Sequence, residues 1–254
     1  MNKRQKIITS PAWHDCYDAI VTALESFDTQ GETLHDQRNV VKRAQLNGQD
    51  VVIKSFRVPA AIQSVIYASF RKSKARRSFE NASRLLSLGV STPEPIAWVE
   101  EKSGARLGRS YYICRYQPHA QSMADILKPY DASDASQRTL VAFTEFTFQL
   151  HQKNILHIDH NSGNTLISKD GDAHSFSLID INRMRFMPLN LRQRMNNFVR
   201  LSDDAEVLQI IAHSYARVAG YYPTKTATLL FALKKQHLRR IERKRCMKHC
   251  LKRR

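Results

Sequence analysis

Hydrophobic and polar positions along the chain change their period near the middle of the sequence. In the first half, β-rich runs dominate, at 38–46, 49–56, 95–100 and 110–116. An Asn-Gly pair separates the first two runs, and it is a strong hairpin signal because both turn residues must tolerate a positive φ. These runs predict a small antiparallel sheet.

Helical periodicity accounts for most of the remaining chain. Near the start, Trp13, Tyr17, Ile20, Val21 and Leu24 are spaced as one face of a short helix. Further helices are predicted over 59–89, 135–153, 188–200, 202–219 and from about 224 onward, with short β-like segments at 165–168 and 176–181.

One helix start carries a specific sequence signal. Asp203 and Glu206 have the spacing of a capping box, which predicts that the helix over 202–219 begins at Asp203.

The order of these elements predicts an α+β fold with two lobes. The N-lobe, 1–116, has a small antiparallel sheet with one major helix, and the mainly helical C-lobe, 117–233, follows. A basic C-terminal helix or tail covers 234–254. We expect a ligand cleft between the lobes, which join near 115–122.

The C-lobe contains the pattern of a kinase catalytic loop. Asp159 is followed five residues later by Asn164, after a long helix and before a short apolar run. In kinases such an Asp accepts or orients the proton of the attacking hydroxyl, and the Asn binds a magnesium ion. Asp180 ends the next β-like run and suits the second metal-binding carboxylate.

Two N-lobe residues complete this pattern. Lys54 stands alone on the second strand of the predicted hairpin, as the phosphate-binding lysine of kinases does, and Glu80 on the following helix is its expected ion-pair partner. Each element alone also suits an ordinary strand lysine, polar loop or solvated helix face. Their order along the chain favours a protein-kinase-like fold that uses ATP and Mg²⁺.

At this level of detail the chain resembles the lipopolysaccharide kinases, which phosphorylate Kdo or heptose sugars of the inner core. The resemblance runs from about residue 31 to 186. It rests on the segments 31–34, 39–42, 52–56, 71–80, 88–97, 159–164 and 179–186. It implies that Asp159 is the catalytic base, Asn164 and Asp180 bind the metal, Lys54 binds the phosphates of ATP, and Glu80 orients Lys54 in the ATP site.

The sequence also departs from the protein-kinase pattern. No Gly-x-Gly-x-x-Gly precedes Lys54, since the segment 30–39 offers only Gly31. Asn182 stands where protein kinases have the Gly of Asp-Phe-Gly, and no Ala-Pro-Glu follows. A small or glycolipid acceptor is therefore favoured over a protein. Arg183 and Arg185 are candidate acceptor-binding residues, or alternatively solvated arginines.

The charge of the chain is strongly positive and unevenly placed. Forty Lys and Arg against 23 acidic residues give a net charge of +17, of which +10 lies in 234–254. A second basic cluster covers 71–77. Such clusters attract polyanions, so we expect an anionic glycolipid acceptor and an anionic membrane surface as partners. Nucleic acid is disfavoured because the basic tail has no aromatic residue for base stacking, and no protein partner can be inferred.

The apolar segments and the cysteines of the chain indicate its cellular location and whether zinc or disulfides are expected. The longest apolar run, 229–233, is far shorter than the ~20 residues of a membrane span, and no apolar leader follows the basic start. We therefore expect a cytoplasmic protein, peripheral on the cytoplasmic face of the inner membrane. Cys246, His249 and Cys250 lie in a cationic run that would repel a metal, so neither zinc nor a disulfide framework is expected.

Two other functions stay open. A phosphotransferase of the aminoglycoside or choline kinase type shares the Asp-x4-Asn layout, although the high positive charge argues against its often cationic acceptors. A noncatalytic kinase-fold scaffold that binds polyanions is the other alternative, and the five phosphoryl-transfer positions argue against it. The leading hypothesis is an ATP- and Mg²⁺-dependent kinase of a Kdo or heptose hydroxyl.

Overall fold

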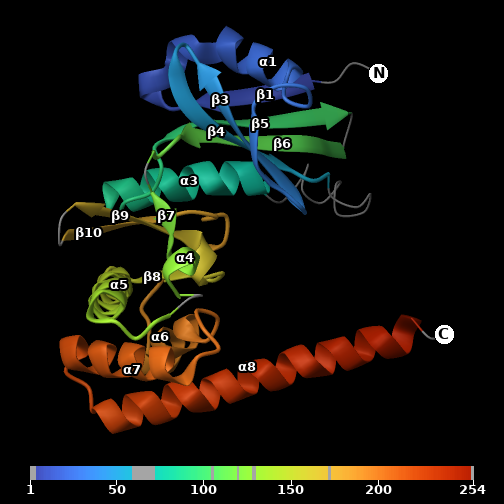
Figure 1. Cartoon of the computed structure of the whole chain (residues 1–254). Helices are drawn as coiled ribbons and strands as arrows, with labels where there is room; N and C mark the ends of the chain where they lie inside the picture. The colour runs from blue at the N-terminus through green and yellow to red at the C-terminus, as the bar shows by residue number, and fades with distance from the viewer. Residues whose placement is uncertain are drawn as a thin grey trace. The chain divides into compact units, whose positions relative to one another are not determined.

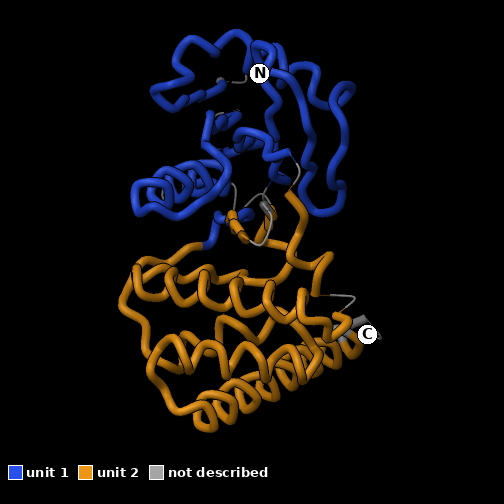
Figure 2. The backbone as a smooth tube through the Cα atoms, turned by 60° about the vertical axis from the view of Figure 1, so that its left-hand side comes forward, with its two compact units in different colours: residues 1–119, 178–183 blue, residues 120–177, 184–254 orange. Residues whose placement is uncertain are grey.

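The computed structural model describes residues 4–58, 72–103, 106–118, 120–127, 130–170 and 173–252. The chain forms two compact units, shown in different colours in Figure 2. Unit 1 comprises residues 1–119 together with 178–183, and unit 2 comprises residues 120–177 and 184–254. The segment 178–183, which holds Asp180, thus belongs with the N-terminal part of the chain, and the basic residues from 234 onward belong to unit 2.

Unit 1 is built on an antiparallel sheet. Its strands are β1 (Arg4–Thr9), β2 (Glu32–Asp36), β3 (Asn39–Leu46), β4 (Gln49–Phe56), β5 (Pro95–Ser103) and β6 (Arg106–Arg115), in the spatial order β1-β5-β6-β4-β3-β2. The predicted hairpin is confirmed as β3–β4, with φ of 47° at Asn47 and 76° at Gly48. The other two predicted runs are confirmed as β5 and β6.

Two helices cover opposite faces of this sheet (Figure 1). The 3-10 turn Pro11–Cys16 and α1 (Tyr17–Glu25) bury Trp13, Ile20 and Leu24 against the sheet side chains of β4, β5 and β6. Tyr17, predicted on the same face of this helix, is 52% exposed, because it begins the helix at the surface.

The other helix, α3 (Lys74–Ser87), contacts β4, β5 and β6. Ser73 caps it by accepting a hydrogen bond from the backbone N–H of Arg76. The prediction of a helix over 59–89 is confirmed for 74–87, and residues 59–71, including Arg71 of the basic cluster, lie outside the described residues. Because side chains alternate along β4, Ile53 packs on the α1 side and Lys54 points to the α3 side.

Unit 2 is mainly helical. Its helices are α4 (Met123–Leu127), α5 (Asp134–Gln152), α6 (Leu191–Phe198), α7 (Ala205–Ala219) and α8 (Pro223–Lys252). Short strands β7 (Gln121–Ser122), β9 (Thr165–Asp170) and β10 (Ala173–Leu178) form one sheet, and β8 (Ile155–His157) pairs with β11 (Met184–Phe186). Buried side chains of α5, α6, α7 and α8 form its core. The predicted helices 135–153, 188–200, 202–219 and 224 onward are confirmed with slightly different ends.

The capping residue of α7 is Asp204, and the prediction of Asp203 was wrong by one position. The Asp204 carboxylate accepts hydrogen bonds from the backbone N–H groups of Glu206 and Val207. Asp203 instead receives the ammonium group of Lys234 at 2.6 Å. Lys234 is buried, so its charge needs a carboxylate partner.

In the described part of the chain, no helix has the length and low polarity that crossing a membrane requires.

The single glycine of segment 30–39 serves a structural purpose. Gly31 precedes β2 with φ of 88°, and a Cβ there would lie 2.8 Å from the carbonyl oxygen of Arg43. Gly48 also has a positive φ, of 76°, but nothing lies within 4 Å of a Cβ built on it. The turn between β2 and β3, Gln37-Arg38, contains no glycine.

Gly31→Ala should therefore destabilise unit 1 more than Gly48→Ala. We expect about 1–2 kcal/mol of backbone strain for Gly48→Ala, and a further ~1–3 kcal/mol for the steric clash in Gly31→Ala. Urea unfolding followed by tryptophan fluorescence measures this, since both tryptophans, Trp13 and Trp98, lie in unit 1. Equal destabilisation by the two substitutions would contradict the close approach of Gly31 to Arg43.

Candidate active site

Unit 1 brings together two of the residues predicted from the sequence. The Lys54 ammonium on β4 lies 2.6 Å from Oδ1 of Asp180, which is 126 positions later in the chain. Both side chains are partly exposed, at 17% and 33%. A lysine and a carboxylate that meet at an accessible surface can together contact a ligand carrying phosphates and a metal ion.

The position of Asp180 is fixed by its neighbours in the chain and by α3. Asp180 has φ of 52°, a left-handed conformation that costs on the order of 1 kcal/mol outside glycine. The amide of Asn182 donates to its Oδ1 at 2.7 Å. Asn81 of α3 donates to the carbonyl of Ile181 at 2.7 Å, and Thr92 donates to the carbonyl of Leu178 at 2.7 Å. The sequence did not reveal Asn81 or Thr92, because their partners are 100 and 86 positions away.

The expected ion pair between Lys54 and Glu80 is not formed, and this prediction is corrected. The Glu80 carboxylate accepts from Lys72 at 2.7 Å and from Arg76 at 2.8 Å, whereas Lys54 pairs with Asp180. Arg76 lies one helical turn before Glu80 on α3, and oppositely charged residues at this spacing form an ion pair. Hydrogen bonds to these two cations help to hold the pKa of Glu80 below its ordinary value, against the opposing effect of burial.

Unit 2 brings together the other two predicted residues, Asp159 and Asn164. The side-chain amides of Asn164 and Asn161 both donate to the backbone carbonyl of Asp159, at 2.8 and 2.9 Å. Asn161 also accepts from the N–H of Gly163, which closes the short 3-10 turn Ser162–Asn164. The spacing of Asp159 and Asn164 therefore corresponds to one compact loop.

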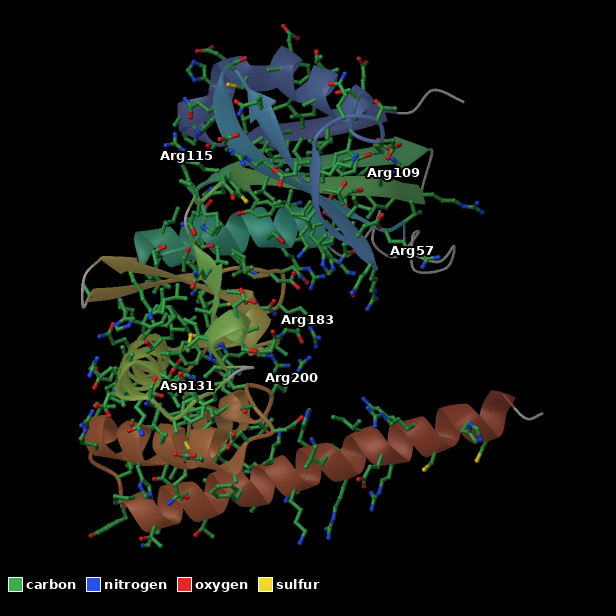
Figure 3. The ribbon with its side chains drawn as sticks, viewed as in Figure 1. Arg57, Arg109, Arg115, Asp131, Arg183 and Arg200 are labelled. Carbon is green, nitrogen blue, oxygen red and sulfur yellow. The ribbon has the colours of Figure 1, made fainter. Side chains whose placement is uncertain are left out.

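Arg200 contacts the loop of Asp159 and Asn164, and the sequence did not identify it as a site residue. It follows α6 (Figure 3), and its guanidinium lies 2.8 Å from Oδ1 of Asp159. The Asp159 side chain is only 18% exposed, so Arg200 fixes the direction of a mostly buried carboxylate. No motif marks Arg200, because the contact joins residues 41 positions apart.

A buried polar network lies behind the loop. Asn197 donates to the carbonyl of His157 at 2.8 Å, and its amide oxygen is 3.0 Å from Nε2 of His151. The hydroxyl of Tyr215 lies 2.9 Å from the other ring nitrogen of His151. Burial lowers the pKa of His151 to about 4 and that of His160 well below its ordinary value. Both rings are therefore neutral at pH 7 and act as fixed parts of the scaffold.

The two candidate acceptor arginines belong to different units. Arg183, exposed, lies in unit 1 just after Asp180 (Figure 3). Arg185 lies at an exposed position of β11 in unit 2, paired in register with Leu156.

A pocket of unit 2 connects the catalytic loop to the basic helix α8. Its volume is about 400 Å³. It is lined by Asn161, Val199, Arg200, Asp203, Lys234, His237, Leu238, Ile241, Glu242 and Arg245. The first part of the basic region is therefore a wall of a pocket that also contains a residue of the Asp159 loop and the partner of Asp159.

A model of the lipopolysaccharide kinase (Kdo/WaaP) family matches residues 43–222, which is more than half of the chain. The chain belongs to this family. The matched region contains Lys54, Asp159, Asn164 and Asp180. The protein is thus a lipopolysaccharide kinase, a phosphotransferase that acts on a sugar hydroxyl, as its sequence predicted.

One solved structure shows the same fold for this lipopolysaccharide kinase, and a second is reported beside it. The structure of WaaP in complex with acyl carrier protein is 14% identical, with a TM-score of 0.61, and the alignment covers 91% of this chain and 97% of that one. The Rio2 kinase–ADP/Mg²⁺–phosphoaspartate complex from Chaetomium thermophilum is 16% identical, with a TM-score of 0.46 and coverage of 91% and 78%. The likeness to WaaP confirms the predicted α+β, protein-kinase-like fold. No curated protein matches the chain by sequence.

The donor groups of the kinase suit a magnesium ion. Mg²⁺ prefers oxygen ligands and is commonly held by one or two protein groups together with substrate phosphates. Asp180 offers a carboxylate, and because the amide N–H of Asn164 is bonded to Asp159, its carbonyl oxygen is the end left to bind a cation. Among the described residues, no group of three His, Cys, Asp or Glu side chains is placed to hold a metal ion.

The buried His151 makes stability depend on pH. Its pKa is lowered on folding from 6.5 to about 4, so the unfolded chain binds more protons between these values. The contribution of His151 to the free energy of unfolding should be complete above pH 6.5. It should decrease by on the order of 3 kcal/mol as the pH falls toward 4.

Substituting His151→Gln removes this titration while retaining polar atoms for Asn197 and Tyr215. We expect the variant to be less stable at pH 7 but to lose less stability between pH 7 and 4 than the wild type. Urea unfolding followed by circular dichroism at several pH values measures the difference. Parallel pH profiles of the two proteins would refute a neutral, buried His151.

Proposed function

We propose that the protein transfers the γ-phosphoryl group of ATP to a hydroxyl of Kdo or heptose in the lipopolysaccharide inner core. The observation that carries this proposal is the pairing of Lys54 with Asp180 in unit 1, alongside the closed loop of Asp159 and Asn164 in unit 2. These are the residue types that phosphoryl transfer uses for positioning and charge neutralisation.

Each residue has a distinct part in this proposal. Lys54 binds phosphate oxygens of ATP, and Asp180 and Asn164 hold Mg²⁺. Bound Mg²⁺ supplies neutralisation of the charge on the transferred group. Asp159 accepts the proton of the attacking sugar hydroxyl, and Arg200 keeps its carboxylate in one orientation. Glu80 acts on this site only indirectly, since its carboxylate is bonded to Lys72 and Arg76.

The acceptor is an anionic glycolipid. In the pocket beside Asn161, Arg200 and Lys234 are paired with Asp159 and Asp203, and Arg245 suits a carboxylate or phosphate group of an inner-core saccharide. Arg183 and Arg185 are exposed and able to contact the same kind of group. This cationic character disfavours a phosphotransferase for cationic small molecules of the aminoglycoside or choline type.

The later part of α8 supports attachment to an anionic membrane. Arg239, Arg240, Arg243 and Lys244 are exposed there, and each Lys or Arg near an anionic surface contributes ~1 kcal/mol. The protein would then act on the cytoplasmic face of the inner membrane, where its lipid-linked acceptor is presented. Acyl carrier protein, present in the solved WaaP complex, is a further candidate partner.

Transfer of labelled phosphate from γ-labelled ATP to purified core glycolipids tests the proposed function. A panel of acceptors ending in Kdo or in heptose distinguishes the two sugars. We expect transfer to one of them by the wild type, and a loss of at least about a hundredfold in Asp159→Ala, because general-base contributions reach 10²–10⁴-fold. Absence of transfer to every core glycolipid by a folded wild-type protein would refute the proposal.

Arg200 gives a second test of the same mechanism. We expect Arg200→Ala to lower kcat by about 10- to 100-fold, the equivalent of a charge-assisted hydrogen bond, and Arg200→Lys to restore part of it. Arg192→Ala is the matched control, since Arg192 is an exposed arginine of α6 whose side chain donates to Gln236. Equal effects of the Arg200→Ala and Arg192→Ala substitutions would show that Arg200 does not position Asp159.

A further inference from the structure

Strand register places a glycine-free turn beside the predicted phosphate-binding lysine. Asn39 pairs with Phe56, and Val41 pairs with Lys54, so the β2–β3 turn containing Arg38 lies at the Phe56 end of β4. In a kinase-like sheet this turn precedes the lysine strand and is where a glycine-rich loop would cover the phosphates. Here its residues are Gln37 and Arg38, so it offers a guanidinium in place of glycine backbone.

A second ammonium group lies close to Lys54. The Nζ atoms of Lys54 and Lys74 are 5.4 and 5.9 Å from the centre of the same ring, that of Phe56, which is 2% exposed. Lys74 is the first residue of α3, and the partial positive charge of a helix N-terminus adds to its own. The register and these ring contacts bring two lysines and the arginine turn to one place.

The charges at this place are poorly balanced. Partial burial, followed by the nearby charge of Arg38, lowers the pKa of Lys74, with further contributions from Arg77 and Lys54. Asp180 is the acid that opposes this shift, and it is already bonded to Lys54. Among the ion pairs and hydrogen bonds between described residues, neither Arg38 nor Lys74 has an acidic partner. By contrast, Lys72 and Arg76 of the same region both pair with the carboxylate of Glu80.

We propose that Arg38, Lys54 and Lys74 form a cationic clamp that binds the phosphate chain of a nucleoside triphosphate in place of a glycine-rich loop. This inference rests on the proposed function and names how its nucleotide is held. Two lysines over one ring and an arginine on the adjacent turn match a ligand with several charged oxygens better than a single phosphate. Affinity should therefore rise with the number of phosphates.

The same chemistry would also recognise a phosphate on the glycolipid acceptor. The experiment must therefore compare nucleotides with the acceptor. We would use the full chain with Lys74→Gln, Arg38→Gln and the double substitution. Lys6→Gln is the matched control, because Lys6 is an exposed lysine of the same sheet that also lies over an aromatic ring, 5.5 Å from the centre of Trp98.

Calorimetric binding of ATP, ADP and AMP at one fixed ionic strength gives the first readout. We expect Lys74→Gln and Arg38→Gln each to weaken ATP binding by about tenfold, ADP binding by less, and AMP binding by less than about twofold. The KM for ATP should rise in the transfer assay while the KM for the glycolipid stays unchanged. Lys6→Gln should bind all three nucleotides as the wild type does.

The other possible results distinguish a failure of the clamp proposal from a failure of the proposed function. The clamp is refuted if both variants bind ATP as tightly as the wild type does. It is also refuted if the variants lose affinity for ATP and for AMP to the same extent. In both cases the proposed function stands. A rise in the KM of the glycolipid alone would assign these cations to the acceptor and also refute the clamp. A folded wild type that binds no nucleotide would instead refute the proposed function.

Discussion

The ion pair between Lys54 and Asp180 is the interaction on which the proposed chemistry depends. It joins a strand of the N-terminal sheet to a residue 126 positions later, at 2.6 Å. The pair exists because the segment 178–183 folds with unit 1 and is held there by Thr92 and Asn81. A left-handed backbone at Asp180 is tolerated because these flanking hydrogen bonds determine its position.

Local signals in the sequence predicted much of this structure. The Asn47-Gly48 turn, the helix of 135–153 and the spacing of Asp159 and Asn164 depend on neighbouring residues, and each has its counterpart in the structure. Side-chain contacts between residues that lie far apart in the sequence could not be predicted. Lys54 pairs with Asp180 instead of Glu80, Lys234 pairs with Asp203, and Arg200 pairs with Asp159 without any motif. Strand β1 was missed for the same reason, because its partner β5 lies about 90 residues later.

The net charge of +17 divides into parts with different roles. Some cations are structural, such as Lys42, whose ammonium donates to the backbone carbonyls of Phe27 and Gln30. Others stabilise the surface, such as Arg109 bound to Asp28 (Figure 3). Near Lys54, Arg38 and Lys74 have no acidic partner among the ion pairs and hydrogen bonds of the described residues, so they are available for ATP. In the pocket lined by α8, Arg200 and Lys234 are paired with Asp159 and Asp203, which leaves Arg245 for an anionic acceptor.

The most direct test of the account replaces Asp180 with Asn, which keeps the shape of the side chain and removes its charge. Phosphate transfer to the core glycolipid is measured at saturating ATP and Mg²⁺, with unfolding measurements to confirm the fold. The account predicts that transfer falls by about a hundredfold or more, as expected when a carboxylate that would hold the charge-neutralising metal ion is lost. Transfer at the wild-type rate by Asp180→Asn would contradict it.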